Sequence, residues 1–436
     1  MVAMNTALIV TSIMLFVFLV SGLPIAFCMG FAGIVGSVLA LGPLGMLQMG
    51  AIPFSYTNGF SLLAIPMFVL MGNILLEYGI GSVLFELVNK MVGRQRGGLA
   101  IAGTFMCAMF GFACGSSSAS CATIGGNVLP EMEKRGYDRR LAVGVMAIAG
   151  SLAIMIPPSI IMVIYSILSE ASLGAVMIAG IIPGFVLTGL IMLYVLIRVT
   201  INPELAPVSE DRHTWKEKLR SLVGMAPIGV LFVAIIGGMF FGLWDAIEAS
   251  AVGVFVALII CIVYFRVLSW SALKRALIGS VKTSTMIYML IVGGNILAYV
   301  FYVTGLQTMI GNFVEGLGVA PWLIIVAMGI ILMIMGCFLD VIAMLTITVP
   351  IFLPIVEKIG YDAVWFGIVA TLFSEMAMIT PPVGVNLFVI LGVAPKGTTL
   401  HDVAMGALPY VGVIWVLIGL LIIWPSIALW LPSLMH

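Results

Sequence analysis

Two pairs of adjacent prolines, 157–158 and 381–382, interrupt otherwise apolar runs of this chain. Proline has no N–H to donate, and its ring clashes with the carbonyl four residues earlier, so each pair breaks a helix. The carbonyls that lose their partners are those of Ala153, Ile154, Ala377 and Met378. In an apolar environment a free carbonyl is costly, and a desolvated cation is a suitable partner for it. A kink used only for helix packing is the alternative interpretation.

The helix that restarts after each proline pair directs its N-terminus toward the same region. A helix N-terminus carries partial positive charge and free N–H groups, which suit an anion such as a carboxylate. One broken helix can therefore offer carbonyls to Na⁺ and amides to a carboxylate.

A cluster of small hydroxyl residues, GSSSAS at 115–120, precedes the first broken helix. Small side chains let backbones approach closely and supply neutral oxygen ligands, although tight helix packing alone would also use them. A serine nucleophile is a poorer interpretation, because the chain has no G-x-S-x-G motif and no buried basic partner at a plausible spacing.

Two isolated acids precede the second proline pair. Asp340 follows Gly336 within a stretch, 316–356, that contains no other charged residue. A carboxylate within a membrane span is functional by default. Asp340 can neutralise a cation or cap the next helix, and both roles remain open. For Glu375, sodium coupling, proton coupling and simple hydrogen bonding all remain open.

These features predict two sodium sites. The carbonyl and hydroxyl oxygens are neutral, and neutral oxygens are better ligands for a cation taken from water than groups for relaying protons. Each site should join one glycine- or serine-rich segment to the broken helix of the same half, with the acid bound between the two sites. Thr380 adds a hydroxyl where the first half has Ile156, so the second site should be richer in oxygen. The predicted sodium ligands are Gly115, Ser116, Ser117, Ala153, Pro157, Gly336, Asp340, Ala377 and Thr380. The predicted substrate contacts are Ser116, Ser117, Pro158, Pro382, Gly384 and Asn386. No cofactor and no other metal are expected.

The composition predicts that these residues belong to a membrane protein. Of 436 residues, 63% are apolar and 8% are charged, and the mean hydropathy is +1.27. A soluble domain carries about 25% charged residues. The formal net charge is zero, which argues against a nucleic-acid partner. Six cysteines without neighbouring histidines argue against a metal centre.

Apolar stretches of roughly 20 residues predict membrane-spanning helices. We expect 11 or 12 spans and an all-α polytopic fold in the lipid bilayer. The predicted spans are 5–41 (one kinked span or two short ones), 60–78, 97–113, 140–168, 174–199, 222–243, 247–265, 283–303, 321–338, 363–393 and 404–431. The segments 114–129 and 339–355 are apolar but short and rich in small residues and proline, which predicts re-entrant hairpins.

An internal repeat organises the chain. Residues 130–158 align with 354–382 without a gap, and the two segments share EK-x-GYD and the proline pair. Asp138 and Asp362 of this motif are predicted helix N-caps. The predicted first repeat is 1–200, with hairpin 114–129 and broken helix 140–168, and the second is 221–436, with hairpin 339–355 and broken helix 363–393.

The segment 201–220 is predicted to link the two repeats on the cytoplasmic side, because it is rich in Lys and Arg. Secondary transporters are commonly built from two such repeats, with the binding site at their interface. An even number of spans between equivalent segments would make the repeats parallel, and one span more or fewer would invert them.

The motifs GSSSAS, EKRGYDRR, IPPSIIMVIYS, AGIIPG, GCFLDVIAM and ITPPVGVNLFV resemble the large membrane subunit of TRAP transporters, the tripartite ATP-independent periplasmic transporters. The resemblance covers nearly the whole chain. It implies an elevator-type carrier of two inverted repeats in the bacterial inner membrane, which imports an organic acid with sodium. It also implies a small four-span membrane subunit, expected as a separate chain, and a periplasmic solute-binding protein. Many members have an acidic residue at the position of Ser120 in this chain. Any role of that acidic residue in the family therefore does not apply to this chain.

Two other functions remain as alternatives. A self-sufficient sodium/dicarboxylate symporter would use the same repeats without a binding protein. An intramembrane hydrolase would need a nucleophile and a base, which the sequence does not offer, so we expect a transporter subunit and not an enzyme.

Overall fold

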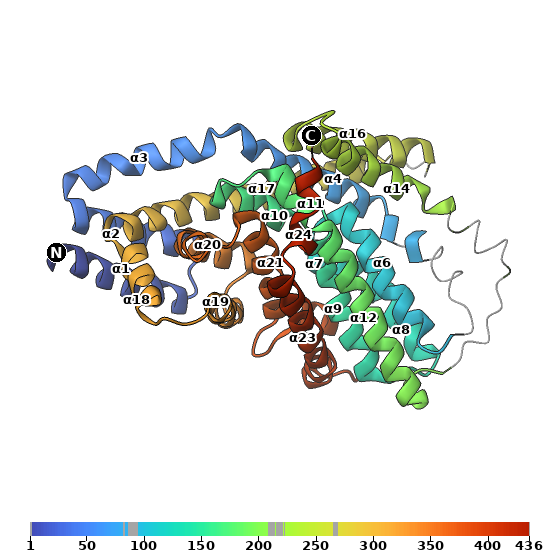
Figure 1. The fold of residues 1–436 in the computed structure, drawn as a ribbon. Coiled ribbons are helices and arrows are strands. Elements are labelled where there is room, and N and C mark those ends of the chain that lie inside the picture. The colour runs from blue at the N-terminus through green and yellow to red at the C-terminus, as the bar shows by residue number, and fades with distance from the viewer. Residues whose placement is uncertain are drawn as a thin grey trace.

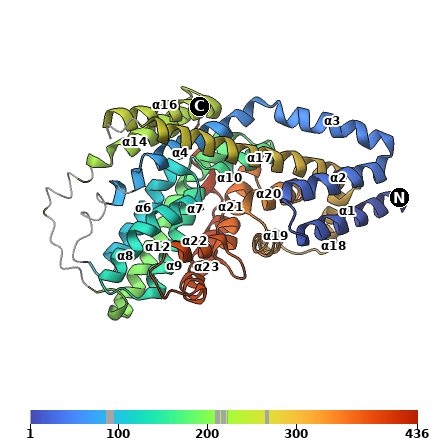
Figure 2. The same cartoon turned by 180° about the vertical axis from the view of Figure 1, so that it is seen from behind.

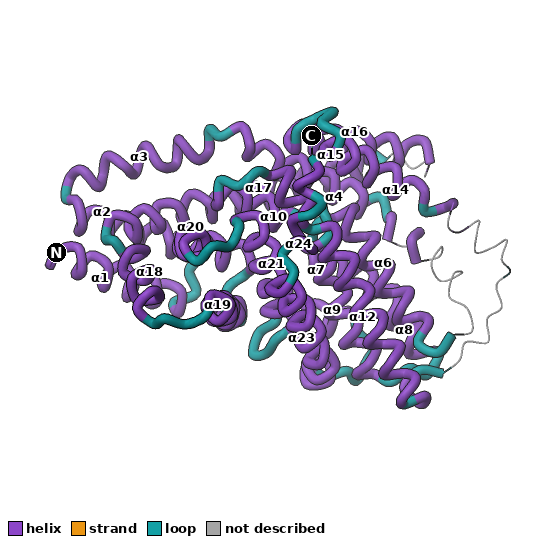
Figure 3. Tube along the Cα trace, viewed as in Figure 1, coloured by secondary structure: helices purple, strands orange, loops and turns teal. Residues whose placement is uncertain are grey.

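The computed structural model describes residues 2–81, 83–85, 95–207, 214, 221, 223–264 and 269–435. These residues form helices joined by short connections, with no strand among them (Figures 1 and 3). The prediction of an all-helical fold is confirmed. Much of the predicted linker 201–220 lies outside the described residues.

The N-terminal part consists of four helices: α1 (Val2–Val20), α2 (Ile25–Leu41), α3 (Pro43–Thr57) and, after a short 3₁₀ turn, α4 (Ala64–Glu77). The predicted range 5–41 is two helices, because the chain turns at Gly22, where φ is +77°, and Pro24 stands at the N-cap of the next helix. Proline is favourable at a helix start, since its missing N–H would have no partner there.

The first hairpin and broken helix follow in order. Their helices are α6 (Gly98–Cys114), α7 (Ser117–Ser120), α8 (Gly126–Lys134), α9 (Arg139–Met155), α10 (Ile160–Ser169), α11 (Leu173–Ala179) and α12 (Ile181–Ile201). A π-helical turn, Cys121–Gly125, joins α7 to α8.

The same succession recurs in the second half. Its helices are α14 (Ala226–Phe232), α15 (Gly238–Phe240), α16 (Ala246–Ile259), α17 (Trp270–Val303), α18 (Leu306–Gly316), α19 (Pro321–Gly336), α20 (Val341–Lys358), α21 (Ala363–Ile379), α22 (Val385–Val393), α23 (Leu400–Ile423) and α24 (Ser426–Leu429). The hairpin turns lie at 115–116 and 337–340, so helices α6 and α19 form the first arms. The range predicted as a hairpin at 339–355 is therefore mostly one helix, α20.

Six helices of the described residues are long and apolar enough to cross a membrane, or seven if α9 and α10, bent by 47°, count as one span. Six further apolar helices have 10–17 residues. The predicted 11 or 12 spans are therefore not all single long helices, because breaks in the backbone divide several of the apolar stretches.

Both broken helices begin as the repeat motif predicts. The carboxylate of Asp138 accepts from the Leu141 N–H at 2.8 Å, and that of Asp362 accepts from the Val364 N–H at 2.8 Å. These contacts satisfy N–H groups that have no partner within the helix. Helix α9 ends at Met155 and α21 at Ile379, just before the proline pairs, whose Pro–Pro bonds are both cis.

Helix α9 runs parallel to α23. Near the start of both helices, Arg140 Nε lies 3.1 Å from Asp402 Oδ1. One turn further along both, Gly144 lies directly against the backbone of Gly406. Only glycine permits this approach, because a Cβ on either residue would overlap the other backbone.

Helix α21 runs antiparallel to the same α23. The Trp365 indole N–H donates to the Leu421 carbonyl at 3.0 Å, near the end of α23. Further along α21, the Phe373 ring meets that of Trp415, which lies earlier in α23, with centroids 5.5 Å apart. Equivalent helices α9 and α21 therefore point in opposite directions, and the expected inversion is confirmed.

Helix α17 crosses between the two ends of the molecule (Figures 1 and 2). Its first half packs on α4, where Asn73 Nδ2 donates to Ser280 Oγ at 2.9 Å. Its second half packs on α2, where a Cβ on Gly33 would lie 2.9 Å from the Leu297 nitrogen. Helix α17 also packs on α20 of the second hairpin. It therefore contacts both helices of the first half and the hairpin of the second half.

Candidate functional site

A cavity of about 320 Å³ lies where the tips of the two hairpins meet the middle of α17. Its wall is formed by Gly115, Ser116, Ser117 and Ser118 of the first tip, Gly336, Leu339, Asp340, Val341 and Ile342 of the second, and Thr283, Met286 and Ile287 of α17. Ile154, Ile160, Ile161, Met378 and Val385 of the broken helices complete it. Five predicted site residues, from two distant parts of the sequence, therefore share one cavity.

The first tip rests on the proline break of its own half. Gly115 has φ +57°, and a Cβ there would lie 2.8 Å from the Pro158 carbonyl oxygen, so only glycine fits. Ser116 Oγ then accepts from the Ala119 N–H at 3.4 Å and caps the next turn. This local geometry turns the chain within two residues and places the serines on the cavity.

The second tip has the same relation to the second break. Cys337 Sγ lies 3.5 Å from the Pro381 carbonyl oxygen, and Gly336 packs directly against Ala377. The carboxylate of Asp340 accepts from the N–H groups of Ile342 and Ala343 at 2.8 and 3.1 Å. Capping, one of the two roles left open for Asp340, is therefore present, and the exposed carboxylate also lines the cavity.

Neighbouring side chains and amides partly satisfy the carbonyls at the breaks. Ser159 Oγ donates to the Ile154 carbonyl at 2.6 Å, and the Thr380 N–H lies 3.4 Å from the Ala377 carbonyl. The Thr380 hydroxyl donates to the Met376 carbonyl at 2.6 Å. The expectation that Ile154 offers a free carbonyl is therefore wrong for this conformation. The signal in the sequence for this hydrogen bond to the Ile154 carbonyl was Ser159, which directly follows the proline pair.

Asn386 links the second broken helix to the first tip. Its Nδ2 donates to Ser117 Oγ at 2.7 Å and lies 3.3 Å from the Ala147 carbonyl, and the Ser117 hydroxyl lies 3.1 Å from Oδ1. Both side chains are buried. In this conformation Asn386 holds Ser117 in place and does not face the cavity, which differs from its predicted role as a substrate contact.

The remaining predicted residues lie around the cavity without lining it. Thr380 and Pro382 border a separate hollow of about 410 Å³, together with Cys337 and Phe338 of the second tip. Besides Asn386, the predicted residues that line neither space are Ala153, Pro157, Pro158, Ala377 and Gly384. The second tip therefore separates the cavity from the hollow beside Thr380.

Sequence reasoning missed the contribution of α17. The predicted span began at 283, whereas the helix begins at Trp270, so Thr283 lies near its middle. The available signal was the polar segment Lys282-Thr283-Ser284-Thr285 within a long apolar stretch. Hydroxyl residues at such a depth face protein or water in preference to lipid.

Glu375 is fully buried in α21, and neither of its carboxylate oxygens has a hydrogen-bond partner among the described residues. The equivalent position in the first repeat is Ser151, whose hydroxyl donates to the Ile148 carbonyl at 2.8 Å. The three roles left open for Glu375 stay open.

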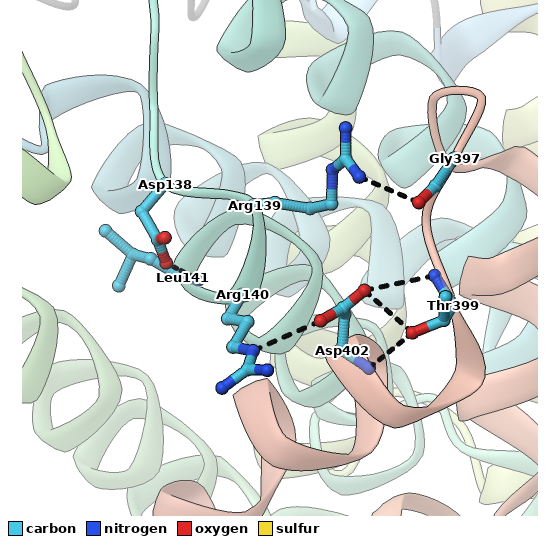
Figure 4. A network of polar contacts seen from close by, with 7 residues as sticks. All are labelled: Asp138, Arg139, Arg140, Leu141, Gly397, Thr399 and Asp402. Carbon is cyan, nitrogen blue, oxygen red and sulfur yellow. Dashed lines mark hydrogen bonds and ion pairs between the residues drawn. The ribbon is translucent and has the colours of Figure 1, made fainter.

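A polar network away from the tips fixes α23 beside α9 (Figure 4). Arg139 Nη1 donates to the Gly397 carbonyl at 2.7 Å, and Arg140 pairs with Asp402. Asp402 also bonds the hydroxyl of Thr399, which begins α23, at 2.7 Å. A pocket of about 520 Å³ adjoins this network, but none of the predicted site residues lines it.

Known proteins resemble this chain in sequence along most of its length. Residues 12–427 match the family described as the tripartite ATP-independent periplasmic transporter, DctM component. The C4-dicarboxylate TRAP transporter large permease protein DctM of Pseudomonas aeruginosa is 33% identical over 91% of this chain and 92% of that protein. The isethionate TRAP transporter permease protein DctMQ of Oleidesulfovibrio alaskensis is 32% identical over 86% of this chain and 59% of that protein.

Solved structures resemble the fold at low sequence identity. The YdaH transporter of Alcanivorax borkumensis aligns with a TM-score of 0.66 and 15% identity over 91% of both chains. The MtrF structure of Neisseria gonorrhoeae aligns with a TM-score of 0.60 and 16% identity over 88% of this chain and 85% of that one. At such identity the likeness concerns the fold alone. The family match and the relatives at 30% identity or more show that this chain belongs to the DctM family, the large permease subunits of TRAP transporters.

Proposed function

We propose that this protein imports an organic acid across the bacterial inner membrane together with sodium, as the large subunit of a tripartite system. The cavity between the two hairpin tips carries the proposal, because it brings segments more than 200 residues apart, each with polar groups at its tip, onto one small space. Relatives are named for C4-dicarboxylates, isethionate and 2,3-diketo-L-gulonate, which are organic acids.

The proposed sodium sites pair each tip with the break of its own half. The first comprises Gly115–Ser117 with Ala153–Pro157, and the second comprises Gly336–Asp340 with Ala377–Thr380. The close approaches of Gly115 to Pro158 and of Gly336 to Ala377 support this pairing. Carbonyl and hydroxyl oxygens at such turns are suitable ligands for a cation that has left water.

The orientation follows from the distribution of basic residues. Residues 133–140, around the start of α9, include Lys134, Arg135, Arg139 and Arg140, whereas the equivalent residues 357–364, around the start of α21, include Lys358 alone. Because α9 and α21 are antiparallel, these segments lie at opposite ends. Positive charge favours the cytoplasm, so the end with the arginines is proposed to be cytoplasmic.

Two partners complete the proposed system. A small four-span membrane subunit would cover part of the exposed apolar flank, and a periplasmic binding protein would deliver the acid. The fused name of the isethionate relative and the 59% of its length that this chain covers support a small subunit as partner. Transport would proceed by an elevator movement of the two tips and broken helices against α17 and its neighbours.

Uptake into proteoliposomes tests the proposal. Vesicles that contain this chain and the small subunit, with the binding protein outside, should accumulate the acid when sodium is higher outside. Replacement of external sodium by potassium or choline at constant pH should abolish accumulation, and equal uptake under all three cations would disprove sodium coupling. High-affinity uptake by the chain alone would favour the self-sufficient symporter.

A further inference from the structure

Among the described residues, none with a positively charged side chain lines the cavity between the tips. Among the residues that line it there is no Lys, Arg or His, and its one charged residue, Asp340, is an acid. An anion buried there must therefore be stabilised by hydroxyl groups, by backbone N–H groups and by the coupled cation. Each additional negative charge would add a desolvation penalty without a basic side chain among the lining residues to offset it.

Only a few polar groups in the cavity are available to a ligand. Ser117 is already bound to Asn386, and Asp340 is an acceptor that caps α20. Among the described residues, the hydroxyls of Ser118 and Thr283 have no hydrogen-bond partner, and Ser116 Oγ is used as an acceptor only. Three side-chain hydroxyl protons thus remain, which is more than the two oxygens of one carboxylate but fewer than the four oxygens of a dicarboxylate.

The rest of the wall is apolar. Side chains of Ile160, Ile161, Met286, Ile287, Ile342 and Val385 face the cavity, and they come from four different helices. A ligand surface in contact with these side chains is stabilised because its apolar area is removed from water. A volume of about 320 Å³ fits an acid of a few carbon atoms beyond its carboxylate.

We infer that the cavity selects a monocarboxylate with an apolar body over a dicarboxylate of the same length, and that Thr283 of α17 holds the carboxylate. This inference rests on the proposed function and adds to it the class of substrate. Thr283 is then a specificity-determining residue contributed by a helix outside both hairpins.

Ligand binding to the purified complex of large and small subunits provides the test. Calorimetry in sodium buffer would compare two pairs of acids matched in length: valerate with glutarate, and α-ketoisocaproate with α-ketoglutarate. The monocarboxylate of each pair should bind at least about tenfold more tightly. Tighter or equal binding of the dicarboxylates would overturn the inference.

The role of Thr283 is tested by a matched pair of variants on the same helix. Thr283→Val should weaken monocarboxylate binding about tenfold, since a hydrogen bond to a charged group is lost, and Thr283→Ser should restore it. Thr285→Val alters an exposed threonine that does not line the cavity, and it should bind as the unchanged protein does. Equal affinity of the Thr283→Val and Thr285→Val variants would show that Thr283 does not hold the ligand.

Sodium dependence separates this inference from the proposed function. Sodium-dependent binding of dicarboxylates in preference to monocarboxylates would leave the proposed transporter standing and overturn the substrate class. Absence of sodium-dependent binding for all four acids would overturn both.

Discussion

Ser117 of the first hairpin and Asn386 of the second broken helix form two hydrogen bonds to each other although 269 residues separate them, with Nδ2 to Oγ at 2.7 Å and Oγ to Oδ1 at 3.1 Å. Both side chains are buried, so water does not compete for these bonds. The amide therefore fixes a serine of one repeat at the cavity by means of the other repeat. Any movement that separates the first tip from α22 must break this pair.

We expect the Ser117–Asn386 pair to be strongly coupled. Ser117→Ala and Asn386→Ala should each lower stability by about 1–3 kcal/mol, because each leaves a buried polar partner unsatisfied. The double variant should cost less than the sum of the two single changes. Thermal unfolding of the four proteins in detergent measures this, and additive losses would contradict a direct interaction. Asn127→Ala, which removes a bond within one hairpin arm, is the matched control.

Thr380→Val should raise the sodium concentration that gives half-maximal uptake by roughly tenfold to a hundredfold, the equivalent of about 1–3 kcal/mol for one lost oxygen partner. Thr371→Val is the control, since Thr371 lies in α21, the helix that Thr380 terminates, and its hydroxyl also bonds a carbonyl one turn earlier. Uptake in proteoliposomes at graded sodium distinguishes them. An identical sodium dependence of the two variants would place the second sodium site elsewhere.

Asp340→Asn should raise the sodium requirement by a similar factor, because it removes the one charge among the described residues that line the cavity, while a neutral amide of the same size can still cap α20. Asp362→Asn changes the corresponding cap of α21, which does not line the cavity. It should leave sodium dependence unchanged and alter stability alone. A shift of equal size in both variants would mean that capping, and not cation binding, explains the effect.

Gly115→Ala should impair folding or uptake, because residue 115 has φ +57° and the added Cβ would lie 2.8 Å from the Pro158 carbonyl oxygen. A left-handed conformation costs a residue with a Cβ roughly 1–2 kcal/mol, and the overlap adds to this. Gly189→Ala, in an exposed stretch of α12 with no atom within 4 Å of the new Cβ, should be neutral or stabilising. Unfolding temperature and uptake rate should both fall for the first variant only.

Local interactions made the helix ends and helix caps of this protein predictable from the sequence. The proline pairs end α9 and α21 where predicted, since a missing N–H breaks a helix in any context. Asp138 and Asp362 cap the following helices as predicted, because the contact spans only three residues. The repeat, the membrane environment and the two tips followed from composition and from motifs that can be read along the chain.

Contacts between distant segments were decided by the tertiary structure alone. The opposite directions of α9 and α21 depend on how both pack on α23, and a count of spans could not supply this because breaks obscure which apolar stretches cross the membrane. Asn386 faces Ser117 and not the cavity, although its position after the proline pair suggested a ligand. Thr283 lines the cavity because α17 begins at Trp270 and passes both tips at mid-length. Local rules specify where a helix starts and stops, whereas the packing of apolar faces determines which side chains share a cavity.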